Sequence, residues 1–147
     1  MTIPRNTFGL ARSWLEDRAQ LLDLDCEVEL EGPPRWNSRS LYFDGPEGAV
    51  LELIERRDLA PGCSSTFSAK HLTCVSEVGI EPYGEPPGRD FAAVGDLHGL
   101  LILVRPGRAW LPTADRQAAM AAITVEAVGP RPGTCTLGAG TSVHVTR

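Results

Sequence analysis

Two glutamates stand in segments that alternate like β-strands, where a carboxylate could bind a metal ion or a polar ligand. Glu52 lies in the aliphatic run 49–54, and the period of two places Val50, Glu52 and Ile54 on one face. Glu77 lies in HLTCVSEVGI, on the same side as Val75. An unpaired buried charge is costly. Glu52 therefore has two interpretations: a salt bridge or backbone hydrogen bond at a sheet rim, or a ligand contact inside a concave sheet.

The three histidines do not complete a metal site with these glutamates. A first-row divalent metal takes three or four ligands, commonly including imidazole. His71 shares a side with Glu77 but lies six residues away, roughly 20 Å along an extended strand. His98 is predicted in a turn and His144 in the last strand, so we expect three ordinary surface or edge histidines. No cofactor is expected, and a divalent metal (Mn, Fe, Ni or Zn) at Glu52 and Glu77 is the alternative.

Other catalytic motifs are missing from the sequence. It contains no GxSxG, GxxxxGK[ST] or GxGxxG pattern. The four cysteines (Cys26, Cys63, Cys74 and Cys135) have long, irregular separations and form no CxxC pair, which argues against a zinc site. We interpret them as buried or incidental thiols, although their even number also permits disulfides.

Bulk properties exclude several classes of function. The 147 residues suit one domain or two small modules, and the net charge of −5 argues against non-specific nucleic-acid binding. No apolar run approaches the roughly 20 residues that cross a bilayer. MTIPRNTFGL lacks the features of a signal peptide. We therefore expect a cytoplasmic protein with neither a membrane nor a nucleic-acid partner.

The chain is predicted to contain one helix and about eight strands, an α+β fold with mainly antiparallel pairing. Apolar residues at helical spacing predict a helix over 8–22, and alternation around DGPEG predicts a hairpin over 37–55. The other predicted elements are strands at 27–30, 71–80, 91–95, 99–104, 122–128 and 141–146, and a helical turn at 117–122. We divide the chain into a first module at 1–57, a linker at 58–70 and a second module at 71–147.

Two segments echo each other. LYFDGPEGAVLELIE and FAAVGDLHGLLILVR both run from a strand through a turn that begins with Asp and ends with Gly into an aliphatic strand. The ordered set WNSRSLYFDGPEGAVLELIERRDL, FSAKHLTCVSEVGI and FAAVGDLHGLLILVRPGRAWLPT resembles the vicinal oxygen chelate superfamily. That superfamily includes glyoxalases, bleomycin-resistance proteins, fosfomycin-modifying enzymes and extradiol dioxygenases. The resemblance covers most of residues 3–128.

The resemblance implies paired βαβββ modules whose curved sheets form a cup around one divalent metal. Glu52 matches the last-strand glutamate of module one, and Glu77 falls where the first strand of module two often carries a histidine. Leu103 stands where the last-strand glutamate of module two would be expected.

The chain departs from the family pattern in two further places. The first strand of module one is cut to residues 1–4. Module two lacks its helix, because residues 81–90 hold three prolines and two glycines. A sheet without its helical cover would expose apolar surface and favour a homodimer.

Three hypotheses follow. The first is a non-catalytic binding member that sequesters a small apolar or aromatic ligand, with Tyr42, Phe43, Phe91 and Trp110 lining or rimming the pocket, although core packing is the alternative for each. The second is a metal-dependent lyase, isomerase or dioxygenase whose site is completed in a dimer. The third is a truncated remnant that persists only as an oligomer.

Overall fold

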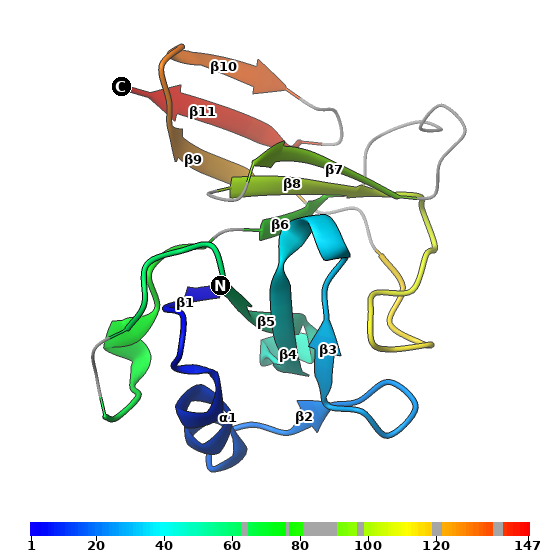
Figure 1. Ribbon diagram of the computed structural model, residues 1–147. Helices are drawn as coiled ribbons and strands as arrows, with labels where there is room; N and C mark the ends of the chain where they lie inside the picture. Colours follow the sequence, from blue (N-terminus) through cyan, green and yellow to red (C-terminus); the bar gives the residue numbers. More distant parts are fainter. Residues whose placement is uncertain (63–64, 76, 81–90, 97–98, 119–121, 137–139) are drawn as a thin grey trace.

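The computed structural model describes residues 1–62, 65–75, 77–80, 91–96, 99–118, 122–136 and 140–147. This part of the chain contains one α-helix and three β-sheets, which confirms the α+β class (Figure 1). Five strand pairings are antiparallel and three are parallel. The helix is α1 (Phe8–Glu16), and the strands are β1 (Thr2–Ile3), β2 (Leu21–Leu22), β3 (Glu29–Glu31), β4 (Ser38–Asp44), β5 (Val50–Arg56), β6 (Glu77–Ile80), β7 (Phe91–Asp96), β8 (Gly99–Val104), β9 (Thr124–Val128), β10 (Gly133–Thr136) and β11 (Ser142–Thr146).

The first sheet is built around the predicted hairpin of β4 and β5. Its strand order is β1-β5-β4-β2, and β3 also pairs with β4. Tyr42 lies directly opposite Glu52 in the antiparallel ladder. The turn uses positive φ at Glu47 and at Gly48, a conformation that glycine adopts without steric cost. β1 then adds in parallel at the edge of β5, with Thr2 opposite Ile54, so the shortened first strand has two residues and still pairs.

Helix α1 covers one face of this sheet. Phe8, Ala11 and Leu15 recur at helical spacing and are buried. They pack with Leu41 and Leu53, whose side chains project toward the helix from the two hairpin strands. The remaining buried members of this core are Ile3, Phe43 and Phe67. Burial of each such large side chain contributes about 1.5–3 kcal/mol, so the helix and hairpin hold each other in place.

The helix is shorter than its apolar periodicity predicts. It ends at Glu16, with Asp17 as the C-cap, whereas the sequence pattern continues to residue 22. Leu21 and Leu22 instead form β2 and pair with Phe43 and Tyr42. Two leucines at helical spacing also satisfy a sheet edge, and the available pairing partner in β4 decides between the two structures.

The second and third sheets repeat one strand arrangement. The second sheet has the order β6-β8-β7. In it, β6 is parallel to β8, and β7 is antiparallel to β8. The third sheet has the order β10-β11-β9, with β9 parallel and β10 antiparallel to β11. In the first sheet, β1 is likewise parallel to β5, and β4 is antiparallel to β5. The sequence echo between the two hairpins therefore extends to the pairing of their neighbouring strands.

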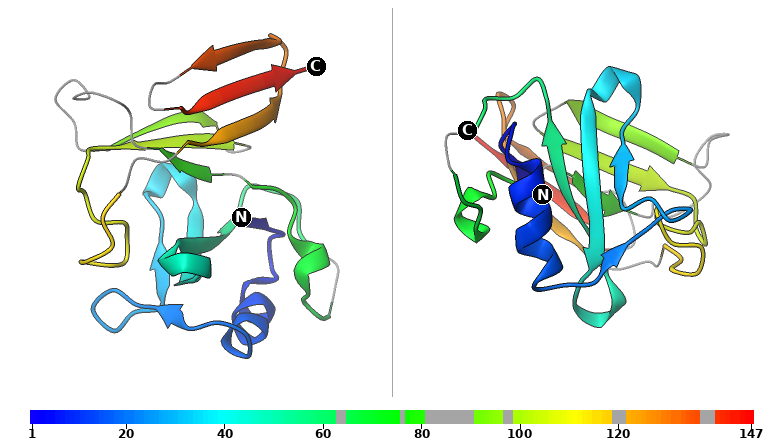
Figure 2. Two further views of the ribbon diagram at one scale, coloured as in Figure 1. Left: turned by 180° about the vertical axis from the view of Figure 1, so that it is seen from behind. Right: turned by 60° about the horizontal axis from the view of Figure 1, so that its bottom comes forward.

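The elements are stacked in layers from α1 through the first and second sheets to the third (Figures 1 and 2). A second core forms around Leu100, Ile102 and Val104 of β8. Trp36, from the 3₁₀ turn Pro34–Trp36 that precedes β4, packs against this core and joins the first two layers. Arg116 also forms an ion pair with Asp44 at the end of β4.

Other sequence predictions need correction. The strand predicted at 71–80 is confined to β6, because Ala69–His71 forms a 3₁₀ turn closed by Ser68. Strand β10 lies in the Pro/Gly-rich stretch 129–140, where none was predicted, and it pairs with β11. Gln117 and Ala118 are not helical, whereas residues 119–121 of the predicted helical turn lie outside the described residues. Residues 81–90, where the family helix was predicted to be missing, also lie outside them.

Ion pairs connect β3 to the rest of the first layer. Arg12 of α1 contacts Glu29 at 2.7 Å, and the hydrogen bonds that it donates to Glu16 and Glu29 raise its pKa. Arg57 donates two hydrogen bonds to Glu31, at 2.6 and 2.8 Å. These bonds lower the pKa of Glu31, with smaller contributions from the charges of Arg57 and Arg39. The short strand β3 is thus held by side-chain charges as well as by its backbone ladder.

Candidate ligand-binding site

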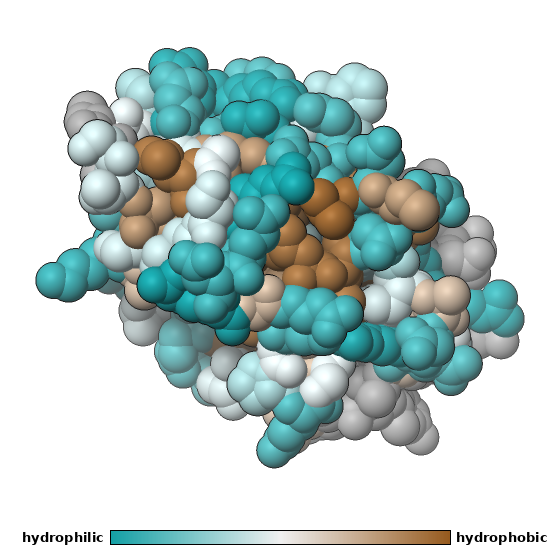
Figure 3. Space-filling model, turned by 90° about the horizontal axis from the view of Figure 1, so that it is seen from below, coloured by the Kyte–Doolittle hydropathy of each residue, from teal (hydrophilic) through white to brown (hydrophobic). Residues whose placement is uncertain are grey.

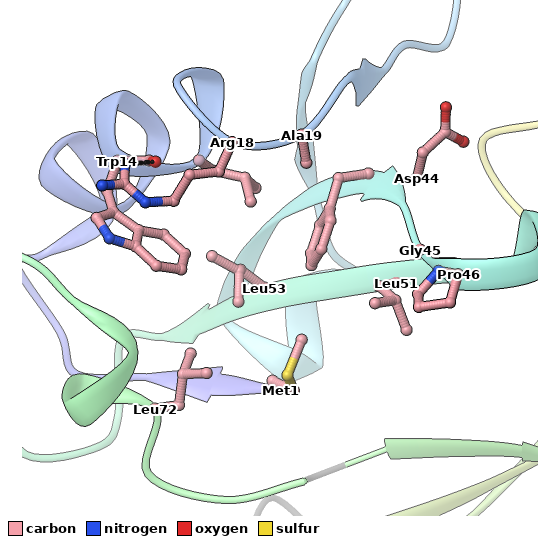
Figure 4. Close-up of a pocket in the computed structure, with 12 residues that line it drawn as sticks. Met1, Trp14, Arg18, Ala19, Asp44, Gly45, Pro46, Leu51, Leu53 and Leu72 are labelled. Atoms are coloured by element: carbon pink, nitrogen blue, oxygen red, sulfur yellow. Dashed lines mark hydrogen bonds between the residues drawn. The ribbon is translucent and has the colours of Figure 1, made fainter.

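A pocket of about 330 Å³ opens on the helical face of the first sheet (Figure 4). It lies between the end of α1, the β4–β5 turn and the segment that carries Leu72. From below, apolar residues form a patch surrounded by polar ones (Figure 3). The lining residues are Met1, Trp14, Leu15, Arg18, Ala19, Phe43, Asp44, Gly45, Pro46, Leu51, Leu53 and Leu72.

The pocket follows from a mismatch of lengths. A helix of nine residues is about 13 Å long, whereas a strand of seven residues spans about 23 Å. The helix therefore cannot cover the whole hairpin. Leu51 and Leu53 project from β5 toward the helical side, and Leu51 is only half-buried beyond the helix end. The early end of α1 thus leaves apolar side chains to form a concave surface.

The aromatic wall of the pocket is fixed by packing on its far side. The ring centroid of Trp14 lies 5.6 Å from that of Phe67, in an edge-on arrangement. Phe67 in turn stacks on the imidazole of His71, with 5.5 Å between their centroids. His71 is held by Ser68, whose backbone N–H donates to its Nδ1 at 3.0 Å. His71 therefore has a structural role behind Trp14.

Two charged side chains reach the pocket rim. The Arg18 guanidinium lies over the Trp14 ring, 4.8 Å from its centroid, and Nη1 donates to the Trp14 carbonyl oxygen at 2.7 Å. The Asp17 carboxylate is 3.7 Å away and mostly in solvent. On the other side of the pocket, Asp44 is paired with Arg116. The rim therefore presents one cation over an aromatic ring and one neutralised carboxylate.

Glu52 lies on the opposite face of the same strand. Its side chain is half-buried, and it alternates with Leu51 and Leu53, which line the pocket. Among the residues that the structure describes, its carboxylate has no hydrogen-bond or ion-pair partner, although its backbone oxygen accepts a 2.6 Å bond from the Met1 ammonium group. Glu52 and the pocket are therefore two separate features of β5.

The other predicted site residues do not gather in this pocket. Phe43 lines it, but Tyr42 projects to the face that carries Glu52. Trp110 packs against the core of the second sheet. Glu77 and Phe91 begin β6 and β7, and their side chains lie outside the described residues. The predicted combination of Glu52 with Glu77 thus stays a prediction.

Metal-ligating side chains do not cluster in the described ranges. Within them, no three His, Cys, Asp or Glu side chains stand close enough to hold a metal ion. His144 bonds to Thr134 at 3.0 Å and to Ser142 at 3.2 Å, on the exposed third sheet. His98 lies outside the described residues.

Comparison of the sequence with models of known protein families and with curated proteins finds no match. The described part of the chain has no helix that is long and apolar enough to cross a membrane.

Sequence reasoning missed several residues of the pocket. Trp14, Arg18, Leu51 and Leu72 carry no motif, and the first three read as ordinary helix or strand positions. A weak signal does exist: Trp14 and Arg18 are four residues apart, a spacing that places two side chains together on a helix.

Proposed function

We propose that this protein binds a small apolar or aromatic molecule without transforming it. The observation that carries the proposal is the pocket of about 330 Å³ on the helical face of the first sheet. This volume is at the lower end of the usual range for ligand sites, and its lining is predominantly apolar, as in most such sites. A ligand there would displace water from Leu51, which is half-buried, and would lie over the buried Leu53 and Phe43.

The chemistry of the lining favours binding over catalysis. Its only ionisable side chains are Arg18 and Asp44. A guanidinium does not give up its proton at physiological pH. The Asp44 carboxylate is already held in an ion pair with Arg116. The lining side chains therefore include no thiol, hydroxyl, amine or imidazole that could act as a nucleophile or general base at neutral pH.

The resemblance to the vicinal oxygen chelate superfamily supports the same proposal. Residues 2–56 run strand, helix and then strands, and the first strand lies parallel to the last. β6 is likewise parallel to β8, and β7 is antiparallel to β8. The described residues between β6 and β8 contain no helix. An abbreviated two-module member of the superfamily would have this order of elements. Sequestration of a ligand, as bleomycin-resistance proteins perform it, would suit a member whose set of metal ligands is predicted to be incomplete.

The first test measures the binding of 1-naphthol, a neutral aromatic probe, by calorimetry. About eleven non-hydrogen atoms fit the pocket if each takes roughly the volume of a water molecule. At a ligand efficiency of about 0.3–0.5 kcal/mol per atom, this size corresponds to a Kd of about 0.1–4 mM.

Leu51→Trp should fill the pocket and abolish binding, because Leu51 is half-buried on its wall. Glu52→Gln, on the other face of β5, is the matched control and should bind normally. Equal binding by the wild type and Leu51→Trp would overturn the proposal.

A metal-dependent lyase, isomerase or dioxygenase is the second candidate, because Glu52 is half-buried and has no partner among the described residues. Such an enzyme would need ligands from a partner chain in a dimer. Metal analysis of protein purified without chelator, together with its mass in solution, tests this candidate. Stoichiometric Mn, Fe, Ni or Zn that is lost in Glu52→Ala supports the enzyme. A metal content far below one per chain contradicts it.

A further inference from the structure

We infer that the ligand of the pocket at the end of α1 is an amphipathic monocarboxylate, with an apolar body against Leu51 and Leu53 and its carboxylate at Arg18. This inference rests on the proposed binding function and names the ligand class. It follows from the charges at the rim.

Arg18 has donors to spare at the edge of the pocket. A guanidinium carries five N–H donors, and the only one with a hydrogen bond in the described residues is bonded to the Trp14 carbonyl oxygen. The 3.7 Å approach to Asp17 is too long for a hydrogen bond, and the Arg18 side chain is half-exposed. Contact with the Trp14 ring holds the guanidinium beside the apolar lining formed by Leu51 and Leu53. A carboxylate would therefore meet a positioned cation with free donors.

Among the lining residues, no carboxylate is free to bind a cationic ligand. Asp44, the only acidic side chain among the lining residues, forms an ion pair with Arg116. An ammonium ligand would have to compete with Arg116 for Asp44 and would also be repelled by Arg18. The rim consequently selects for an anion and against a cation.

The size of the pocket limits the apolar body. Roughly eleven non-hydrogen atoms fit, on the basis of the volume that water occupies per molecule. Octanoate has a similar size, so octanoate, 1-octanol and octylamine form a series in which only the head group changes. The apolar contribution to binding is shared by all three.

The test measures the Kd of these three probes by calorimetry at pH 7. The wild type should bind octanoate about two- to fivefold more tightly than 1-octanol, as expected for a half-exposed ion pair, and octylamine most weakly. Arg18→Gln should remove the preference for octanoate, and Arg18→Lys should retain most of it. Added salt should reduce the preference in the wild type.

Arg12→Gln is the matched control, because Arg12 lies on the same helix but pairs with Glu16 and Glu29 away from the pocket. It should leave the three affinities unchanged. If 1-octanol binds as tightly as octanoate, or if Arg18→Gln keeps the preference, the inference is wrong while the binding function stands. If none of the three probes binds, the inference fails, and the proposed function fails with it only if 1-naphthol does not bind either.

Discussion

Glu52 and Leu53 are consecutive residues of β5, and their side chains lie on opposite faces of the first sheet. Leu53 is 1% exposed beneath α1, whereas Glu52 is half-buried on the other face. The pocket belongs to the helical face, together with Leu51 and Phe43. Any ligand in the pocket is therefore separated from Glu52 by the sheet itself.

This alternation predicts that substitutions at Leu53 and Glu52 reduce the free energy of unfolding by unequal amounts. Leu53→Ala should reduce the free energy of unfolding by about 2–5 kcal/mol, since it leaves a cavity in the core. Glu52→Gln should change it by less than about 0.5 kcal/mol, because the carboxylate has no partner among the described residues. Denaturant unfolding of both variants measures the difference. Similar losses for the two would show that the faces are assigned incorrectly.

The ion pair between Arg39 and Glu55 is predicted to be strongly coupled. Arg39 Nε lies 2.9 Å from Glu55 Oε2, and the exposed fractions of the two side chains are 31% and 2%. Arg39→Gln leaves a buried carboxylate unpaired and should cost about 2–3 kcal/mol, less than a fully buried pair because Arg39 is partly solvated. The double variant Arg39→Gln/Glu55→Gln should lose less than the sum of the two single variants. A double-mutant cycle by urea unfolding tests this, and additive losses would contradict it.

The pair of Arg57 and Glu31 predicts a contribution to stability that depends on pH. Hydrogen bonds from Arg57 lower the pKa of Glu31 below its ordinary value. The folded state therefore binds the Glu31 proton less readily than the unfolded state. The resulting stabilisation is complete at neutral pH and is lost as the pH falls below about 4.3 and through the folded-state pKa.

Glu31→Gln removes this contribution and should cost less than about 1 kcal/mol at pH 7, because the pair is largely exposed. The difference in unfolding free energy between the wild type and Glu31→Gln should shrink between pH 5 and pH 3. A difference that is constant over this range would argue against the pairing.

Arg116 is predicted to control the charge preference of the pocket, although it does not line it. Its ion pair neutralises Asp44 at the rim. Arg116→Gln would leave that carboxylate uncompensated and should tighten octylamine binding by about two- to fivefold relative to 1-octanol, as expected for an exposed pair. Asp44→Asn in the same background should cancel the gain. Unchanged octylamine affinity in Arg116→Gln would mean that Asp44 does not face the ligand.

The sequence predicts the first layer well, because its signals are local. Alternation and turn residues place the β4–β5 hairpin, and the period of two assigns Glu52 and Leu53 to opposite faces. The end of α1 could not be predicted, since Leu22 fits both a helix and a pairing with Tyr42 that becomes available only in the folded sheet. β10 was missed for a similar reason, because Thr134 and Cys135 gain strand structure from β11 rather than from their own alternation.

The pocket could not be predicted for a different reason. It results from the difference in length between α1 and the hairpin, which depends on where the helix ends. Phe43 was named as a ligand contact, but it was grouped with Tyr42, whose side chain lies on the other face. Residues from distant parts of the chain, such as Met1 and Leu72, meet there only through tertiary packing.

The most direct test of the account is an NMR titration of the protein with octanoate, monitored at the leucine and methionine methyl groups and at the tryptophan indoles. The account predicts saturable shifts at Met1, Trp14, Leu51, Leu53 and Leu72, which line the pocket. Trp36 and Trp110, which pack against the second core, should not shift. Shifts centred on the Trp36 and Trp110 indoles, or no saturable shift at the lining residues, would contradict it.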